Sequence, residues 1–284
     1  MNLSSPETVK SLLLKYKTRP SKRMGQNFLI NSATLNKVLE AAELNKEDIV
    51  LEIGAGLGNL TEELAKRVKM VIAVEKDKAM VDILKETLKD YKNIKIIHGD
   101  ALKFDHKKYD LRAEGYKIVA NIPYYLTSPI IRKFLESENK PSLMVLMVQK
   151  EVAQRICPKP PKMSLLAVSV QFYAKAEIVD YVPKKYFWPS PEIDSAIIKI
   201  TPFGILTAST NKKVDVDLFF KIVRAGFSQP RKQLVNNLST IKSLNGVGLD
   251  KNLVAKWILK NGLSPKQRAE TLSVDDWIKV TECF

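Results

Sequence analysis

A buried strand that runs directly into a glycine-rich turn stands at residues 49–58, which read IVLEIGAGLG. The apolar run 49–53 is typical of a strand that is covered on both faces. The glycines permit a tight turn, and the apolar spacing that begins near Leu60 predicts a helix after it. A dinucleotide fingerprint needs a glycine at position 59, where this chain has asparagine, so the run alone is a weak sign of a nucleotide site.

The alternation of strand and helix continues on both sides of this turn. Helical spacing predicts helices at residues 6–16, 32–43, 60–68, 78–88, shortly after 128, and at 150–156. Apolar runs predict further strands at residues 70–75, 94–97, 118–120 and 143–148. Strands that alternate with helices form βαβ units, so we expect an α/β fold around a mostly parallel sheet.

The last third of the chain follows a different pattern. Residues 165–172 and 195–200 favour strands, which we expect to form an antiparallel hairpin on the sheet. Mixed polarity at 204–211 predicts a linker. Beyond it, helices are expected at 216–226, 231–238, 253–260 and 274–283. The sequence therefore predicts an α/β domain at 1–203 and a small all-helical C-terminal domain at 212–284.

The charge balance indicates a polyanionic partner. The chain has 284 residues, and 46 lysines and arginines against 31 acidic residues give a formal net charge of +15. Such an excess favours nucleic acid or an anionic membrane surface. No apolar run is long enough to span a bilayer, and the N-terminus lacks the pattern of a signal peptide. Cys157 and Cys283 form no CxxC pair, so we expect free thiols in a reducing, cytoplasmic setting.

Two carboxylates follow the strands that come after the glycine turn. Glu75 ends the strand at 70–75, where an acidic residue can bind ribose hydroxyls. Asp100 follows the strand at 94–97 and can accept a hydrogen bond from an adenine amino group. A surface position for Glu75 and a helix N-cap role for Asp100 are the simpler alternatives. Together with the turn, the two carboxylates predict a cofactor that contains adenosine.

A second polar cluster, Asn121-Ile122-Pro123-Tyr124-Tyr125, follows the strand at 118–120. Ligands of open α/β sheets bind beyond the carboxyl ends of the strands. The Asn121 amide can accept a hydrogen bond from an amino group, and the Tyr124 ring can lie flat against a planar base. An Asn-X-Pro turn with a core tyrosine is the simpler alternative. Because this cluster has no role in hydride transfer, S-adenosylmethionine is favoured over NAD as the cofactor.

These features together resemble the class I, Rossmann-like methyltransferases that act on adenine N6. Three further stretches narrow the resemblance to the rRNA adenine dimethyltransferase family and, within it, to the bacterial KsgA-type branch. They read GQNFL at 25–29, FWPSPEIDSA at 187–196 and FSQPRKQL at 227–234. The resemblance covers nearly the whole chain.

The resemblance implies an activity, a cofactor and a partner. The activity is transfer of methyl groups from S-adenosylmethionine to N6 of two adjacent adenosines near the 3′ end of small-subunit rRNA, with S-adenosylhomocysteine as the product. The expected partner is a pre-30S ribosomal particle, which the C-terminal domain would help to recognise. The protein is expected to act as a monomer in the cytoplasm, without a membrane.

The resemblance also assigns residues. Asn121, Pro123 and Tyr124 would hold the target adenine, and Phe187 would cover its other side. The positions that match the family's cofactor site are Asn27, Leu29, Gly54, Gly56, Glu75, Asp100 and Asn121. The Asn121 side-chain oxygen and a backbone carbonyl of residue 122 or 123 can hold the two N6 hydrogens and aim the lone pair of the nitrogen. Positioning of this kind needs no strong base and no metal.

Basic side chains at several places can meet phosphate, although each cluster alone is equally well explained as a solvated face. The residues are Lys22, Arg23, Lys150, Arg155, Arg224, Arg231 and Lys232. His98 and His106 lie far from other metal-ligating residues in the sequence, so no metal site is expected.

The sequence departs from the family pattern at three places, one of which is Tyr125, where bacterial members often have asparagine. Residues 160–165, PPKMSL, replace a common Tyr-Gly before Leu-Ser, and Pro230 replaces an arginine. Two alternatives stay open at this point. One is the related large-subunit rRNA dimethyltransferase that confers macrolide resistance, and the other is an rRNA-binding assembly factor of the same fold without catalysis.

Overall fold

The computed structural model describes residues 3–109, 111–112, 115–203, 214–241 and 248–283. The chain divides into two compact units, the first made of Met1–Ala153 and Ala176–Pro202, the second of Gln154–Lys175 and Phe203–Phe284. The break at residues 202–203 lies beside the expected end of the α/β domain, and residues 154–175 fall in the second unit. The predicted linker at 204–211 lies outside the described residues.

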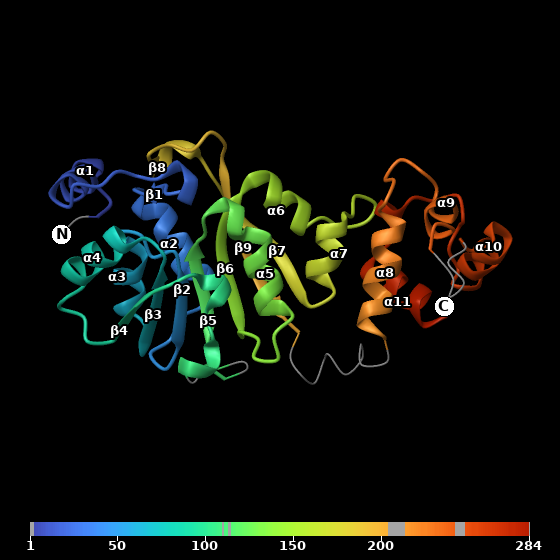
Figure 1. Cartoon of the computed structure of the whole chain (residues 1–284), viewed down its shortest axis with the longest axis horizontal. Helices are drawn as coiled ribbons and strands as arrows, with labels where there is room; N and C mark the ends of the chain where they lie inside the picture. Colours follow the sequence, from blue (N-terminus) through green and yellow to red (C-terminus); the bar gives the residue numbers. More distant parts are fainter. Residues whose placement is uncertain (1–2, 110, 113–114, 204–213, 242–247, 284) are drawn as a thin grey trace. The chain divides into compact units, whose positions relative to one another are not determined.

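Seven strands form one sheet in the order β4-β3-β2-β5-β6-β9-β7, which can be followed across Figure 1. The pairs β2–β3, β3–β4, β2–β5 and β5–β6 are parallel, whereas β6 and β9 are antiparallel. The mostly parallel α/β sheet predicted from the sequence is therefore confirmed. The strands are β2 (Ile49–Ile53), β3 (Met70–Glu75), β4 (Ile94–His98), β5 (Lys117–Asn121), β6 (Leu143–Gln149), β7 (Ala174–Val182) and β9 (Ser195–Pro202).

The helices between the strands begin and end within a few residues of their predicted bounds. Asn31 caps α2 and Asp77 caps α4, each by accepting a backbone N–H with its side chain. Apolar residues of α2 and α3 pack with alternate residues of the central strands, such as Val71 and Val119, in one buried cluster. The helices are α1 (Pro6–Lys15), α2 (Ser32–Ala41), α3 (Asn59–Ala65), α4 (Lys78–Thr87), α5 (Thr127–Leu135) and α6 (Lys150–Ile156).

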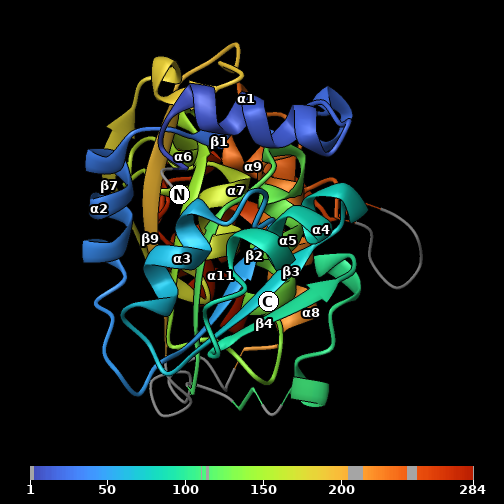
Figure 2. The ribbon, with the colours of Figure 1, turned by 90° about the vertical axis from the view of Figure 1, so that its left-hand side faces the viewer.

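The N-terminal segment lies at the end of the sheet where the parallel strands finish, as both ribbon views show (Figures 1 and 2). Helix α1 packs its apolar face on residues of α4, including Met80 and Ile83. The chain then forms a 3-10 turn, η1 (Lys22–Met24), and the short strand β1 (Phe28–Leu29). Strand β1 pairs with β8 (Phe187–Trp188), so two motifs far apart in the sequence meet here.

The predicted strand at 165–172 is wrong, because these residues form helix α7 (Leu165–Gln171). Ser164 caps the helix by accepting the Ala167 N–H. A short apolar run fits a buried helix as well as a strand, and the cap decides between them. The strand that flanks β9 in the sheet is instead β7, at 174–182, which the sequence did not predict.

The second unit is helical, as expected. Its core joins α7 to the C-terminal helices, and the Phe172 and Phe219 rings stack with their centroids 4.2 Å apart. This contact explains why α7 belongs to the second unit. The C-terminal helices are α8 (Val216–Gly226), α9 (Leu234–Leu238), α10 (Lys251–Lys260) and α11 (Val274–Glu282).

Candidate active site

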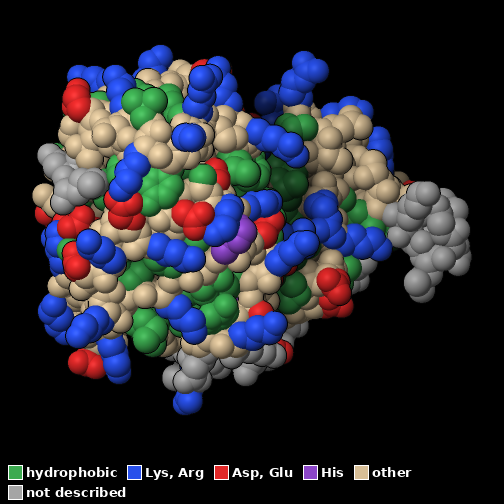
Figure 3. All heavy atoms as spheres, turned by 60° about the vertical axis from the view of Figure 1, so that its left-hand side comes forward, with side chains coloured by type: hydrophobic (Ala, Val, Ile, Leu, Met, Phe, Trp, Pro, Cys, Tyr) green, Lys and Arg blue, Asp and Glu red, His purple; other side chains and the backbone are tan. Residues whose placement is uncertain are grey.

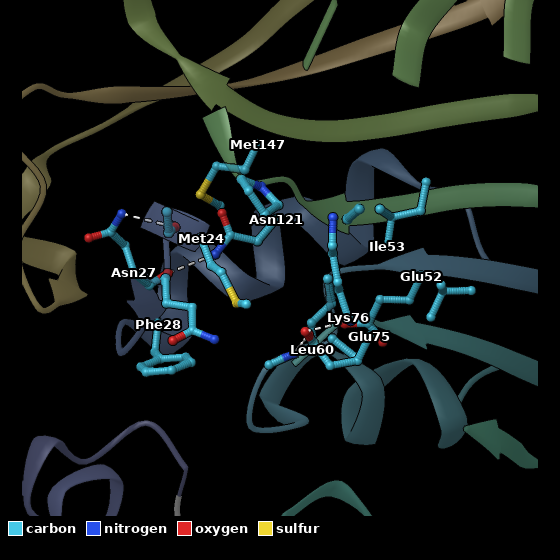
Figure 4. A pocket seen from close by; sticks show the side chains of 18 of the residues that line it. Met24, Asn27, Phe28, Glu52, Ile53, Leu60, Glu75, Lys76, Asn121 and Met147 are labelled. Carbon is cyan, nitrogen blue, oxygen red and sulfur yellow. Dashed lines mark hydrogen bonds between the residues drawn. The ribbon is translucent and has the colours of Figure 1, made fainter. Parts of the chain in front are cut away.

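A cavity lies at the carboxyl ends of β2, β3 and β5, the edge of the sheet where the sequence predicts a ligand. The turns after these strands and the N-terminal segment 24–29 form its wall (Figure 4). The structure thus brings all the predicted cofactor residues to one cavity. They are Asn27, Leu29, Gly54, Gly56, Glu75, Asp100 and Asn121.

The glycine turn lets the backbone approach this cavity closely. Gly54 and Gly56 have φ angles of +74° and +58°, in the left-handed region that favours glycine. A Cβ atom at Gly54 would lie 3.2 Å from Pro123 Cδ, and one at Gly56 would lie 3.2 Å from the Phe28 ring. A side chain at either position would therefore crowd the cavity wall.

Glu75 is buried at the end of β3 and is held by backbone N–H groups. Its Oε2 accepts the N–H of Gly56 at 2.9 Å, and its Oε1 accepts those of Lys76 and Asp77 at 2.8 Å each. Burial raises the pKa of Glu75, and these three donors oppose the rise. A carboxylate has about four acceptor sites, so Glu75 keeps capacity for a further donor such as a ribose hydroxyl.

Glu52 is a second carboxyl group in the cavity wall, on the strand before the glycine turn. Its side chain is only 2% exposed, and its Oε2 atom has no hydrogen-bond partner among the described residues. Burial raises the pKa of Glu52 to about 8; the Thr61 hydroxyl opposes this rise, and the neighbouring Glu75 carboxylate adds to it. An unpartnered polar atom in a buried position is available for a hydrogen bond with a ligand.

Asp100 lies on the opposite side of Glu75 from the glycine turn, after β4. Its Oδ1 accepts the Leu102 N–H at 2.9 Å, so the predicted N-cap role is present as well as the position in the cavity. Its Oδ2 forms a 2.8 Å ion pair with Lys76, and this contact lowers the pKa of Asp100. An adenine amino group would have to share Oδ2 with Lys76 or displace it.

Asn121 ends β5 and is turned toward the N-terminal segment. Its Nδ2 donates to the Asn27 carbonyl at 3.1 Å, and the Asn27 side chain donates in turn to the Gly25 carbonyl at 3.2 Å (Figure 4). Because the nitrogen end of the Asn121 amide is engaged, the Oδ1 end remains to accept a hydrogen bond from a ligand.

The residues after Asn121 form a tight turn. The Leu126 N–H donates to the Pro123 carbonyl at 2.8 Å, which starts the 3-10 helix η4 (Tyr124–Leu126). Pro123 and Tyr125 line the cavity, and Tyr125 is 53% exposed. Tyr124 is not among the lining residues, and its hydroxyl forms a 2.7 Å hydrogen bond with that of Ser195.

Phe187, like Tyr124, is not among the residues that line the cavity. The side chain is 2% exposed and packs in the core cluster with Leu29 and Val182, outside the cavity wall. The structure therefore does not bring Phe187 to the cavity, and its role as a cover for the base stays a prediction.

Many residues of the cavity wall were not predicted from the sequence, and Met24, Lys76 and Met147 are three of them. Met24 belongs to a segment that looked only basic, and Lys76 was not separated from other exposed lysines. Met147 belongs to the run that predicted the strand at 143–148; it is 1% exposed in the core cluster and also borders the cavity. The position of Met147 near the end of β6, beside Asn121 in the sheet, was the signal that could have identified it.

The predicted RNA-binding residues are all exposed and fall in both units. Lys22, Arg23 and Lys150 lie in the first unit. Arg23 also lies close enough to Lys76 to lower its pKa electrostatically, although the Asp100 carboxylate dominates and raises it. In the second unit the exposed residues are Arg155, Arg224, Arg231 and Lys232. Their part in RNA binding stays a prediction.

The described residues contain no group of histidine, cysteine or acidic side chains that could hold a metal ion. Within the same ranges, no helix has the length and apolar character to cross a membrane.

Comparison with known proteins agrees with the geometry. A relative from Dehalococcoides mccartyi, named ribosomal RNA small subunit methyltransferase A, is 44% identical over 271 residues, which cover 95% of this chain and 90% of the relative. The crystal structure of a dimethyladenosine transferase from Plasmodium falciparum is 28% identical with a TM-score of 0.75, and the match covers 89% of this chain and 95% of that one.

The 23S rRNA methyltransferase ErmE shares the fold, with a TM-score of 0.71 and 24% identity over 90% of this chain and 99% of that chain. Residues 18–284 match the family described as ribosomal RNA adenine dimethylase. This match includes the glycine turn, the Asn121 cluster and the helical C-terminal region. The chain therefore belongs to the ribosomal RNA adenine dimethylase family.

Proposed function

We propose that this enzyme uses S-adenosylmethionine to dimethylate N6 of two adjacent adenosines near the 3′ end of small-subunit rRNA. The observation that carries the proposal is one cavity in which the glycine turn and Glu75 lie beside Asn121 and Pro123. The relative named small subunit methyltransferase A supports the choice of subunit, since it is 44% identical.

The hydrogen-bonding groups and the open space of the cavity suit S-adenosylmethionine. Glu75 keeps acceptor capacity for ribose hydroxyls, and the unpartnered Oε2 of Glu52 can form a further hydrogen bond with the ligand. Gly54 and Gly56 leave room that a Cβ would fill. When bound, S-adenosylmethionine would supply an electrophilic methyl group on a sulfonium sulfur.

The chain's own contribution is to hold and orient the adenine amino group. The Asn121 Oδ1 would accept one N6 hydrogen, because Nδ2 already donates to Asn27. The Pro123 carbonyl already accepts the Leu126 N–H, so the Ile122 carbonyl is the better second acceptor. Two acceptors at the amino group draw the nitrogen toward tetrahedral geometry and expose its lone pair, and such positioning lowers the barrier without a strong base.

Tyr124 would provide the platform on which the flipped-out adenine lies. Stacking on an aromatic ring is worth about 1–3 kcal/mol per base, which offsets part of the cost of unstacking the adenine from its neighbours. A first methyl group leaves one N6 hydrogen, so a second transfer at the same atom is possible if the cavity accepts the first methyl.

The partner of this enzyme would be a pre-30S particle, bound by the monomeric protein in the cytoplasm where subunits assemble. The net charge of +15 supports a polyanionic partner.

The test is methyl transfer from labelled S-adenosylmethionine to unmethylated small ribosomal subunits, with large subunits in parallel. We expect label only in small-subunit rRNA. Label in the large subunit would instead favour a large-subunit rRNA dimethyltransferase of the kind that confers macrolide resistance. Tight binding of the subunit and of S-adenosylhomocysteine without any label would point to a non-catalytic assembly factor.

A further inference from the structure

The Tyr124 side chain is held by a residue that is 71 positions away in the sequence, at the start of strand β9. The Tyr124 hydroxyl and the Ser195 hydroxyl lie 2.7 Å apart, and either oxygen can be the donor. Tyr124 is partly buried, and burial raises the pKa of its phenol, so the group that meets Ser195 is neutral at physiological pH. At the other end of the residue, the backbone is fixed by the turn between Pro123 and Leu126.

Ser195 itself is fixed more firmly than Tyr124. It is the first residue of β9, it is 0% exposed, and it pairs with Gln149 of the central strand β6. The preceding residue, Asp194, accepts the Lys150 N–H with its backbone oxygen and the Lys184 N–H with its Oδ1, each at 3.0 Å. The Ser195 hydroxyl is therefore held rigidly by the sheet. Tyr124, in contrast, belongs to η4, a single 3-10 turn of three residues.

Ser195 has no contact with the candidate cofactor site. It is absent from the cavity wall, which contains Asn121 and Glu75. The Ser195 hydroxyl bonds to Tyr124 and lines no part of the cavity, so we expect its removal to affect the orientation of the adenine more than the binding of the cofactor.

We propose that Ser195 is a positioning residue for methyl transfer, which holds the Tyr124 ring in the orientation that receives the target adenine. The inference rests on the proposed function, since it assigns Tyr124 to the adenine. Without the Ser195 hydroxyl, the partly buried phenol loses its partner and the ring samples other orientations. The fraction of bound adenines in the reactive position then falls.

The experiment compares Ser195→Ala, Tyr124→Phe and the double variant in single-turnover methyl transfer to unmethylated small subunits at saturating S-adenosylmethionine. The stoichiometry of S-adenosylhomocysteine binding, measured by calorimetry, gives the fraction of each variant that is folded. Per folded site, we expect each single variant to lose roughly 3- to 10-fold in rate, the range of one net hydrogen bond. The double variant should be no slower than the slower single variant, because both remove the same interaction.

Two further variants provide matched controls at the opposite end of the sheet. Ser142 donates its hydroxyl to the Tyr116 carbonyl at 3.1 Å, and the Tyr116 hydroxyl donates to the Asn139 carbonyl at 2.9 Å. Ser142→Ala and Tyr116→Phe remove comparable hydrogen bonds and should leave the rate per folded site unchanged. Ser195→Cys, which keeps a weaker hydrogen-bonding group, should recover part of the rate lost in Ser195→Ala.

The results separate this inference from the function on which it rests. If the wild type methylates small subunits and Ser195→Ala is equally fast per folded site, the positioning role is overturned and the proposed function stands. Additive losses in the double variant, or equal losses in the two controls, also overturn it. A wild type that transfers no methyl group overturns the proposed function, and the positioning role with it.

Discussion

The nitrogen end of the Asn121 amide donates a hydrogen bond within the protein, which leaves the oxygen end to accept one from a ligand. The Nδ2 group is fixed on the Asn27 carbonyl, so the side chain cannot flip without losing that hydrogen bond. The N-terminal motif therefore orients the residue expected to hold the adenine amino group. The sequence could identify both motifs, but not the contact between residues that are 94 positions apart.

Asn121→Ala is expected to lower the rate of methyl transfer at least about 100-fold, because it removes an acceptor that acts on the reacting amino group. The dissociation constant of S-adenosylhomocysteine should change by less than about threefold, since Glu75 and the glycine turn remain. Single-turnover rates and calorimetry measure the two quantities. Near-normal turnover in this variant would exclude Asn121 as the residue that holds the adenine.

Glu52 gives a prediction for the pH dependence of stability. Its folded-state pKa of about 8 lies above the ordinary value of 4.5, so the folded protein keeps a proton that the unfolded chain releases. The resulting stability is complete below about 4.5 and is lost as the pH rises toward 8. Glu52→Gln removes this titration. Relative to the wild type it should gain up to about 1.4 kcal/mol in unfolding free energy for each pH unit across that window.

Urea unfolding of the ligand-free protein at several pH values in this window measures the difference. Glu47→Gln, on an exposed side chain, is the control and should follow the wild-type curve. Parallel curves for Glu52→Gln and the wild type would show that Glu52 is ionised in the folded protein.

Among the elements, the parallel strands and the helices between them were predictable because each carries its own apolar periodicity, whereas the short elements η1, β1 and η4 at the cavity were not. The Leu165–Gln171 helix was not, since LLAVSVQ reads equally well as a buried strand. Strand β7 was missed because most of its residues are only partly buried or exposed, with Val179 and Tyr181 exposed. Helix α7 belongs to the second unit because of contacts such as that between Phe172 and Phe219. These residues are far apart in the sequence, so no local sequence pattern could predict the contact.

The packing of α8 on α11 predicts how a substitution between the two helices changes the stability of the helical unit. A Cβ atom at Gly226 would lie 2.3 Å from Cη2 of the fully buried Trp277 ring. Gly226→Ala should therefore lower the unfolding free energy of the helical unit by about 1–3 kcal/mol or more, as overpacking does. Thermal unfolding followed by circular dichroism measures the loss.

The matched control combines Gly226→Ala with Trp277→Phe, whose smaller ring makes room for the added methyl group. The double variant should recover part of the stability that Gly226→Ala loses. A stable Gly226→Ala protein with an unchanged unfolding temperature would contradict this packing of α8 against Trp277.

For the whole molecule, the excess of basic side chains was the clearest feature that composition alone provided. Figure 3 shows lysine and arginine side chains spread over the face in view, interspersed with fewer acidic ones. Composition could not show which of them meet RNA. A basic side chain beside the cavity and one on a solvated face look alike in the sequence, and none of the predicted RNA-binding residues lines the cavity.

RNA affinity should fall steeply with salt, because phosphate contacts release counterions. Between about 50 and 200 mM salt we expect a loss of at least about tenfold for small subunits. Combined Lys22→Gln and Arg23→Gln changes should lower the logarithmic salt slope by about 1–2. The control changes Lys85 and Lys89 to Gln and should leave the slope unaltered. A flat salt response of the wild type would argue against phosphate contacts altogether.

The most direct test of the account is the identity and position of the methylated nucleoside. Unmethylated small subunits are incubated with the enzyme and S-adenosylmethionine, and the rRNA fragments are analysed by mass spectrometry. We expect N6,N6-dimethyladenosine at two adjacent positions near the 3′ end of small-subunit rRNA, and its loss in Asn121→Ala. Methylation at another atom, at a site in large-subunit rRNA, or undiminished in Asn121→Ala would contradict it.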